Sequence, residues 1–377
     1  MAQISTAQPV QAAPRPAARR HMSDRRIIQL FILPTIILLI LMNIFPLIYS
    51  LFLSFNEYSV ISSDAPVWVG LNNYTSILSD AQFWHNFGVT GTYALVSVAL
   101  QTVVGFGLAM LLRTKFTGSG VVTTLILVPM MLSPIVVAVF WRLIFNPSYG
   151  IFNYIFGFLT LLLPTIVALI VIALLWGSVP RILGEGRKTA GYIALIVLIP
   201  IIAHLVWSVV LGQSASYGEF FTRVTTAETA PEWLGEPALA LWAIIIVDVW
   251  MWSPFVMLLC LAGLSAIPEY LYEAAAIDRA SGWFQFRRIT LPQVMPLLLI
   301  AVLFRTIEAF KQFDLVMGLT GGGPGDVTET VSVQLYQLAF QGQFDTGKSS
   351  ALAYIVLVVI IAVSNLYIRA LNRAREG

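Results

Sequence analysis

The sequence has 377 residues, of which 58% are apolar and 11% are charged, against roughly 45–50% and 25% in an average soluble protein. So few charged residues cannot cover a soluble protein of this size, and we expect most of the surface to face lipid. The net charge of +2 excludes the strongly basic surface that nucleic-acid binding requires. One cysteine and three histidines exclude an intrachain disulfide and argue against a structural zinc site.

The first 26 residues are rich in Ala, Pro and Gln and contain the pairs Arg19-Arg20 and Arg25-Arg26. This composition is typical of a disordered basic tail. The apolar run that follows, from Ile27 to Leu53, is far longer than the roughly 7–15 residues of a secretory signal core. We therefore expect this run to be a membrane span.

Membrane-spanning helices need about 20 consecutive apolar residues, because the hydrocarbon core of a bilayer is roughly 30 Å thick. Eight stretches of the chain reach or approach that length. They predict an all-α polytopic membrane protein with about eight transmembrane helices. The predicted spans are 27–53, 88–112, 121–145, 159–177, 191–212, 238–262, 290–312 and 350–369.

The basic residues are distributed unevenly between the two sides that these spans define. Sixteen of the 21 fall on the side of the N-terminal tail. Because positive residues are retained in the cytoplasm during membrane insertion, we expect both termini to be cytoplasmic. The sixteen are Arg15, Arg19, Arg20, Arg25, Arg26, Arg113, Lys115, Arg181, Arg187, Lys188, Arg279, Arg287, Arg288, Arg369, Arg373 and Arg375.

The longest predicted cytoplasmic connection, 263–289, carries a helix signal. Pro268 suits a first helical position and Glu269 suits the positive end of a helix, which we expect to end near Gly282. A second amphipathic piece, from Trp283 to Leu291, should stop at Pro292. On composition alone, a solvated elbow between two spans is an alternative interpretation.

The run Glu273-Ala274-Ala275, followed by Ile289-x-Leu291-Pro292, resembles the coupling-loop signature of permease subunits of type I ATP-binding-cassette (ABC) importers. In that family the loop helix docks into a cytoplasmic ATPase. The family usually has glycine at the position of Arg279, so we expect Gly282 to supply the turn. The resemblance implies ATPase-coupling roles, within the loop 268–292, for Glu273, Ala274, Ala275, Asp278, Arg279, Gly282, Ile289, Leu291 and Pro292.

Two further motifs narrow the resemblance. Val69-Gly-Leu-Asn-Asn-Tyr74 and Leu319-Thr-Gly-Gly-Gly-Pro324 are similar to segments of carbohydrate-uptake permeases of the maltose and glycerol-3-phosphate type, most closely the first permease of such systems. The likeness covers most of 27–150 and 238–371. It implies a permease core, with two extra spans in an insert at about 155–237.

The domain organisation that follows is simple. We expect a disordered cytoplasmic tail over 1–26, a transmembrane permease domain over 27–371 and a short cytoplasmic tail over 372–377. The resemblance implies a location in a bacterial-type inner membrane. It also implies a heterodimer with a second permease, two ATPase subunits that hold ATP and Mg²⁺, and an extracytoplasmic solute-binding protein. We expect no cofactor, metal site or catalytic residue on this chain.

The segment from Gly342 to Ser349 matches the nucleotide-binding pattern G-x-x-x-x-G-K-[ST]. That pattern forms a phosphate cradle only between a strand and a helix of an α/β domain, which this sequence does not predict. The predicted topology also places Lys348 outside the cell. We therefore interpret the match as chance.

Charged side chains near the bilayer centre cost roughly 2.5–3.5 kcal/mol each on insertion scales, so they usually face a cavity or a partner. Arg305, Glu308 and Gln312 share one helical face and are expected to point together into a polar path. Alternatively, Arg305 and Glu308 neutralise each other between helices and the tryptophans pack against lipid. The candidate substrate-path residues are Asp248, Trp250, Trp252, Arg305, Glu308 and Gln312.

These observations favour a pore subunit of an ATP-driven importer of a sugar or sugar-like solute. The alternative is a self-sufficient, proton-coupled secondary transporter that uses Asp248, Glu308 or His204. Such transporters commonly show inverted repeats with interrupted helices in matching positions. The sequence contains no such internal repeat.

Overall fold

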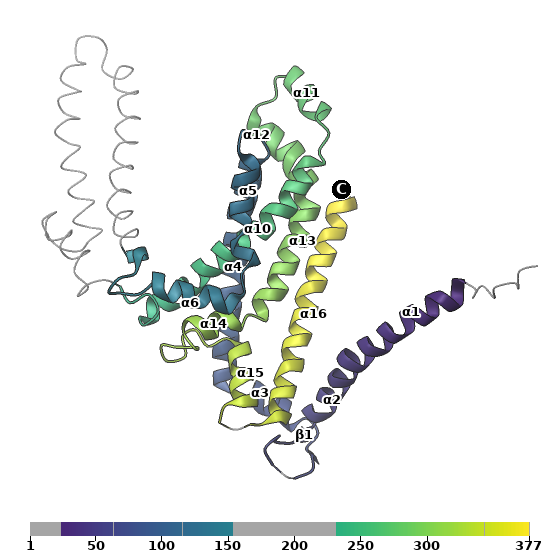
Figure 1. Cartoon of the computed structure of the whole chain (residues 1–377), viewed down its shortest axis with the longest axis vertical. Coiled ribbons are helices and arrows are strands. Elements are labelled where there is room, and N and C mark those ends of the chain that lie inside the picture. Colours follow the sequence, from purple (N-terminus) through teal and green to yellow (C-terminus); the bar gives the residue numbers. More distant parts are fainter. Residues whose placement is uncertain (1–23, 63, 115, 154–230, 343, 377) are drawn as a thin grey trace, which may run out of the picture.

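The computed structural model describes residues 24–62, 64–114, 116–153, 231–342 and 344–376 (Figure 1). These residues are mostly helical, with one short antiparallel hairpin of β1 (Asn56–Glu57) and β2 (Val67–Trp68). The prediction of an all-α protein is confirmed for them. The predicted spans 159–177 and 191–212, His204 and nearly all of the N-terminal tail lie outside the described residues.

Five helices in the described part of the chain are long and apolar enough to cross a membrane. They overlap five of the predicted spans, and most extend beyond the predicted bounds. A 29-residue helix is about 43 Å long and exceeds a hydrocarbon core of roughly 30 Å, so its ends extend into the headgroup regions or beyond. The five are Phe31–Ser54, Ala81–Leu112, Pro237–Ser265, Gly282–Phe310 and Thr346–Arg373.

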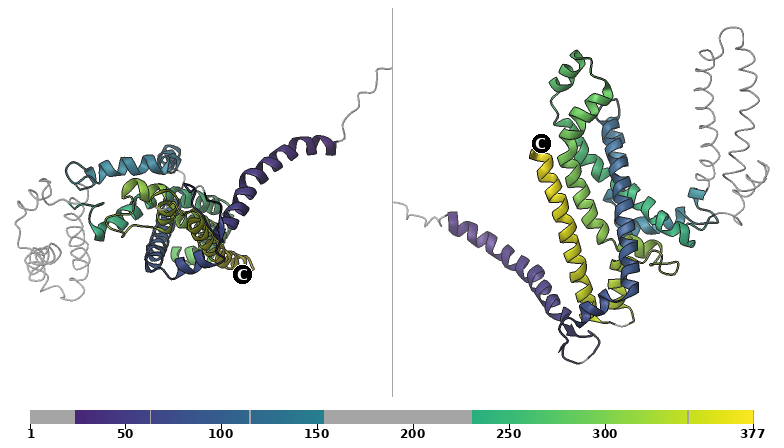
Figure 2. Two further views of the ribbon diagram at one scale, coloured as in Figure 1. Left: turned by 90° about the horizontal axis from the view of Figure 1, so that it is seen from below. Right: turned by 180° about the vertical axis from the view of Figure 1, so that it is seen from behind.

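Four long helices form the body of the molecule: α4 (Ala81–Leu112), α10 (Pro237–Ser265), α13 (Leu291–Phe310) and α16 (Thr346–Glu376). Figures 1 and 2 show them side by side. The backbones of α4 and α10 approach closely at Gly105, where a Cβ atom would lie 2.6 Å from the carbonyl oxygen of Ser253. A side chain at residue 105 would therefore force these two helices apart.

Short elements cover the two ends of this body (Figure 1). One end, which we call the α15 end, holds the hairpin with α3 (Asn72–Leu78) and α15 (Val331–Phe340). The other, the α11 end, holds α11 (Tyr270–Ile277) and α12 (Gly282–Gln285). Nearer the α15 end, α14 (Asp314–Leu319) packs against α6 (Pro134–Ile144). The hairpin, α3 and α15 therefore cover one end of the body, and α11 and α12 cover the other.

The N-terminal helix is different because only its last part joins the body. It consists of α1 (Asp24–Leu39), a π-helical turn (Ile40–Ile44) and α2 (Phe45–Ser54). Helix α2 packs on α16, and the Tyr354 hydroxyl donates a 2.6 Å hydrogen bond to the carbonyl oxygen of Leu47. Helix α1 leaves the body at an angle (Figure 2). No residue of its most apolar stretch is buried by the described part of the chain.

The predicted span 121–145 is not one continuous helix, so this prediction is wrong in its form. The chain forms α5 (Ser119–Leu127), a 3₁₀ turn (Pro129–Met131) and α6. Pro129 and Pro134 begin the second and third of these pieces. Proline has no N–H to donate to the preceding turn and its ring clashes with the carbonyl four residues earlier, so the helix breaks there.

The predicted break at Pro292 is also wrong. Helix α12, a π-helical turn (Phe286–Thr290) and α13 follow one another without interruption over Gly282–Phe310. Pro292 lies in the first turn of α13. The wider turn just before it changes the hydrogen-bond pattern at the place where a proline ring would clash with a regular helix.

Candidate functional site

A cluster of buried polar side chains joins three of the long helices, and we call Gln101, Asp248 and Arg305 the buried polar cluster. Gln101 Nε2 donates to Asp248 Oδ2 at 2.6 Å, and Arg305 Nε donates to Gln101 Oε1 at 2.8 Å. Arg305 Nη2 lies 3.4 Å from Asp248 Oδ1. Gln101 and Asp248 are 0% exposed and Arg305 is 2% exposed. The three residues therefore connect α4, α10 and α13 through a closed network.

The opposite charges of this cluster neutralise each other within the protein. The Arg305 guanidinium also lies 4.5 Å from the ring centre of Trp252, which provides a cation–π contact. Isolated charges are expensive in a membrane and in a protein interior, whereas paired and hydrogen-bonded charges are tolerated. The sequence therefore places Asp248 and Arg305 where each compensates the other.

The six candidate substrate-path residues are not all brought together. Trp250 is 37% exposed and packs edge-on against Trp141, with ring centres 5.5 Å apart. Glu308 pairs with Lys311 at 2.8 Å, and both side chains are about half exposed. Arg305 instead faces the interior because Asp248 is its partner. Gln312 lies beyond the end of α13, so helical spacing does not align it with Arg305.

Sequence reasoning missed the contribution of α4 to this cluster. Tyr93, Ser97 and Gln101 are spaced four residues apart, and all three are 0% exposed. Residues at this spacing lie on one face of a helix. These three residues form a polar stripe in an otherwise apolar span, which is a signal in the sequence. The prediction considered only charged residues in the spans and so left them out.

The predicted coupling loop forms the short exposed helix α11, which ends at Ile277 rather than near Gly282. Its last turn is closed by Arg279, which has the left-handed conformation with φ of 54°. The N–H of Ala280 then donates to the carbonyl of Ala275 at 2.9 Å. The expectation that Gly282 makes this turn is wrong, because Gly282 begins α12 and Ser281 caps it.

No residue of α11 is buried. Ile277 is 82% exposed and Trp283, at the start of α12, is 69% exposed. Glu273 and Asp278 are also exposed, whereas Ile289 and Leu291 are half-buried where the chain enters α13. Large apolar side chains are seldom left together on a surface without a partner. This end of the molecule therefore exposes large apolar side chains together with acidic residues and with Arg279, Arg287 and Arg288.

Two residues of α11, Leu271 and Tyr272, pack against the body of the molecule. The hydroxyl of Tyr272 lies 2.9 Å from Oγ1 of Thr290, just before α13. The guanidinium of Arg113, which follows α4, lies 4.3 Å from the centre of the Tyr272 ring. Tyr272 therefore contacts the residues at which α4 ends and α13 begins. Sequence reasoning did not identify Tyr272, because its partners are remote in the chain.

The segment that matches a nucleotide-binding pattern has a different structural role. It follows helix α15 rather than a strand, and it leads into α16. Gly347 donates its N–H to the Tyr58 carbonyl at 3.0 Å, and a Cβ atom there would overlap the carbonyl oxygen of Asn56. Glycine is thus required for close packing, and the phosphate cradle does not form.

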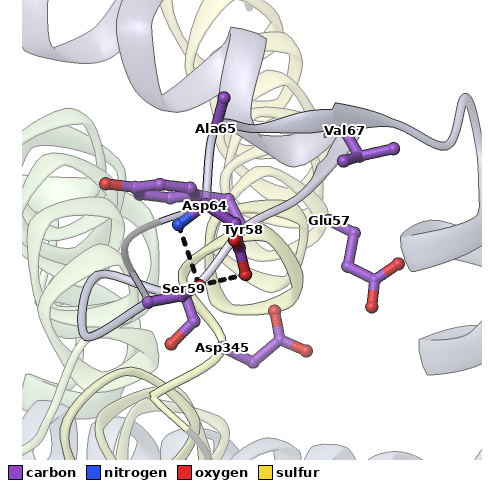
Figure 3. A pocket seen from close by; sticks show the side chains of 8 residues that line it. Glu57, Tyr58, Ser59, Asp64, Ala65, Val67 and Asp345 are labelled. Carbon is purple, nitrogen blue, oxygen red and sulfur yellow. Dashed lines mark hydrogen bonds between the residues drawn. The ribbon is translucent and has the colours of Figure 1, made fainter.

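A hollow of about 470 Å³ lies at the α15 end, beside the hairpin (Figure 3). Three carboxylates line it, from Glu57, Asp64 and Asp345, and no basic residue among those that the structure describes does. The Ser62 hydroxyl donates to Asp64 at 2.6 Å. Within the described residues, no group of three His, Cys, Asp or Glu side chains is placed to bind a metal ion. The hollow itself is therefore acidic.

Known proteins resemble most of the chain. The trehalose/maltose transport system permease protein MalF of Thermococcus litoralis is 31% identical over 340 residues, which are 90% of this chain and 92% of that protein. The profile of the family described as "binding-protein-dependent transport system inner membrane component" matches residues 189–376. The chain belongs to this family. The resemblance to importer permeases that the loop and glycine motifs indicated is therefore confirmed.

Two other proteins extend this result. The trehalose transport system permease protein SugA of Mycobacterium tuberculosis is 26% identical over 357 residues, which are 95% of this chain and 92% of that protein. The fold matches a chain of a bacterial alginate ABC transporter, solved with a periplasmic protein bound to an alginate pentasaccharide. That match has a TM-score of 0.63 and 18% identity, and it covers 91% of this chain and 92% of the other. The described helices thus have the fold of an ABC importer permease.

Proposed function

We propose that this chain is one half of the translocation pore of an ATP-driven importer for a sugar or sugar-like solute. The sugar class is supported by the similarity to the trehalose/maltose and trehalose permeases. A second permease completes the pore, two ATPase subunits bind ATP and Mg²⁺, and an extracytoplasmic protein delivers the solute. The chain itself performs no chemical reaction.

The proposal assigns the α11 end to the cytoplasm and both termini to the same side. The single observation that carries the coupling role is the exposed helix α11, which ends at a left-handed Arg279 and is joined to the body through Tyr272. Glu273, Asp278 and the alanines between them contact the ATPase in this proposal. The acidic hollow at the α15 end then faces the solute-binding protein.

The substrate path in this proposal runs along the aromatic side of the buried polar cluster. Trp250 is the exposed candidate that can cover the apolar face of a sugar ring. Asp248 and Arg305 lie behind this path, and Arg305 contacts the Trp252 ring. Glu308 and Gln312 lie farther toward the α15 end, at the entrance.

The test is charge reversal at Glu273 in the complex with its partners. We expect Glu273→Lys to reduce ATP-dependent uptake of maltose or trehalose at least about tenfold, because an interfacial charge is both lost and opposed. Membrane insertion and yield should be unchanged. The matched control is Arg373→Glu, an exposed charge reversal at the end of α16, which should transport normally.

Two results would overturn this proposal. One is full uptake and full substrate-stimulated ATPase activity in Glu273→Lys. The other is uptake by this chain alone in liposomes under a proton gradient, which would establish the secondary transporter instead.

A further inference from the structure

The side chain of Tyr272 connects α11 to the long helix Gly282–Phe310. Its hydroxyl lies 2.9 Å from Oγ1 of Thr290, which is 2% exposed. Within the described residues, no other side chain of α11 takes part in a hydrogen bond or an ion pair. Because Thr290 is buried, a change that removes the Tyr272 hydroxyl leaves a buried hydroxyl without this partner. Tyr272 is therefore the polar link between the side chains of α11 and the start of α13.

A second polar contact joins the turn after α11 to the same helix. Gln285 Nε2 donates to the carbonyl of Ala280 at 3.1 Å, and the N–H of Ala280 donates to the carbonyl of Ala275 at 2.9 Å. Gln285 is the last residue of α12, directly before the π-helical turn, and Thr290 is the last residue of that turn. The π-helical turn is thus joined to α11 at both of its ends, through Gln285 and through Tyr272.

The connection from α10 to α11 has no comparable polar contact. Helix α10 ends at Ser265 and α11 begins at Tyr270. Within the described residues, no side-chain hydrogen bond or ion pair joins these two helices, and the Ser265 hydroxyl donates back to the Leu261 carbonyl at 2.8 Å. Apolar packing around Ile267, which is 8% exposed, supports the connection. Apolar contacts are non-directional, whereas a hydrogen bond fixes the distance and angle between its groups.

The π-helical turn between α12 and α13 is the place where these polar contacts matter. Helices often kink at π-helical turns, because the regular hydrogen-bond pattern changes there. A force on α11 would bend the chain at this turn if the pieces on its two sides were not joined. The contacts of Gln285 and Thr290 flank the turn and join those pieces. They therefore oppose bending at the one irregular turn between α11 and α13.

We propose that Tyr272 is a positioning residue that couples α11 to α13 during transport. The inference rests on the proposed function, in which the ATPase contacts α11. Tyr272 and Gln285 hold α11, α12 and the start of α13 as one rigid unit, and packed helices commonly move as such rigid bodies. A displacement of α11 reaches α13 first, and α10 follows through the contact of Arg305 with Asp248.

A double-mutant cycle on the two hydroxyls tests this link. Tyr272→Phe and Thr290→Val each remove one hydroxyl and nearly keep the volume of the side chain. Tyr272→Phe also keeps the ring that the Arg113 guanidinium contacts. The complete complex, with its ATPases and its solute-binding protein, is reconstituted in liposomes. The measured quantity is the uptake of maltose or trehalose divided by the ATP hydrolysed.

We expect each single change to lower the sugar moved per ATP at least about threefold, while the ATPase remains bound. The double variant should be no worse than either single variant, because both changes remove the same hydrogen bond. Thr290→Ser keeps the hydroxyl and should couple normally. The matched control is Tyr270→Phe, which removes a hydroxyl of the same helix from a side chain that is 64% exposed. It should also couple normally.

Normal sugar movement per ATP in Tyr272→Phe, together with lost uptake in Glu273→Lys, would overturn this link and leave the proposed function standing. Effects of the two single changes that add in the double variant would also overturn it, since the hydroxyls would then act independently. Loss of the ATPase from the Tyr272→Phe complex would overturn it too, because the hydroxyl would then serve assembly. Normal uptake in Glu273→Lys would instead overturn the proposed function itself.

Discussion

Charged side chains are buried in the middle of this molecule and exposed at its α11 end. In the middle, Asp248 and Arg305 are almost completely buried and neutralise each other within the chain. At the α11 end, Glu273, Ile277 and Trp283 are exposed, and α11 has no buried residue. The charges of the middle are paired within the chain, whereas the α11 end exposes charged and large apolar side chains together. This difference separates substitutions that change stability from those that change assembly.

The largest expected effect comes from removing one charge of the buried pair. Asp248→Leu leaves the Arg305 guanidinium buried without its counter-charge, so we expect a loss of about 3–5 kcal/mol in stability. In Asp248→Leu/Arg305→Met both charges are gone, and most of this loss should be recovered. Thermal unfolding of the purified protein in detergent compares the two. Equal destabilisation by the single and double changes would show that the charges are not coupled.

A smaller loss is expected where α4 and α10 touch. Gly105→Ala places a methyl group 2.6 Å from the Ser253 carbonyl oxygen, and such overpacking costs about 1–3 kcal/mol. The matched control is Gly107→Ala, two residues away, where a Cβ atom meets nothing within 4 Å. It should be neutral or stabilising by up to about 1 kcal/mol. The same unfolding measurement would refute the close contact if both variants behaved alike.

A glycine in place of Arg279 should stabilise the turn after α11. Arg279 has a left-handed conformation that costs a non-glycine residue about 1–2 kcal/mol. We expect Arg279→Gly to stabilise the end of α11 by about 0.5–1 kcal/mol, after the extra entropy of glycine in the unfolded chain. Slower hydrogen exchange at the Ala280 amide in Arg279→Gly than in the unmodified chain would show this stabilisation. The β-branched Arg279→Val should speed exchange, and equal rates in the two variants would contradict the turn.

The smallest effect is expected at the exposed Glu308–Lys311 pair. Both side chains are about half exposed, and pairs of this kind contribute about 0–1 kcal/mol. Glu308→Gln should therefore leave the thermal midpoint nearly unchanged. Uptake by this variant then tests the substrate path separately. Normal uptake at limiting sugar concentration would remove Glu308 from the proposed path.

The long spans could be predicted from sequence because hydrophobic length is a local property. The break between α5 and α6 also has a local cause, in Pro129 and Pro134. Membrane helices often tolerate proline, so these two residues alone did not predict a break. The predicted stop at Pro292 was wrong for the opposite reason. A π-helical turn absorbed that proline and the helix continued.

The candidate site was predictable only in part. Charges inside spans identified Asp248 and Arg305 as important, but their pairing depends on how α10 and α13 pack, 57 residues apart in the chain. Helical spacing favoured Glu308 as the partner of Arg305 instead. Gln101 and Tyr272 were missed because uncharged polar residues become informative only beside their partners. The turn at Arg279 lies where the coupling-loop resemblance implied a glycine, and there the motif was a better guide than the residue present.

Cysteine cross-linking at α11 tests the central claim most directly. Ile277 is 82% exposed, so Ile277→Cys should form a cross-link to the ATPase subunit in membranes that contain the whole complex, and ATP binding should change its yield. A cysteine at Val358, which is 63% exposed on α16 and faces lipid in this account, should form none. A cross-link from Val358→Cys together with none from Ile277→Cys would contradict coupling through α11.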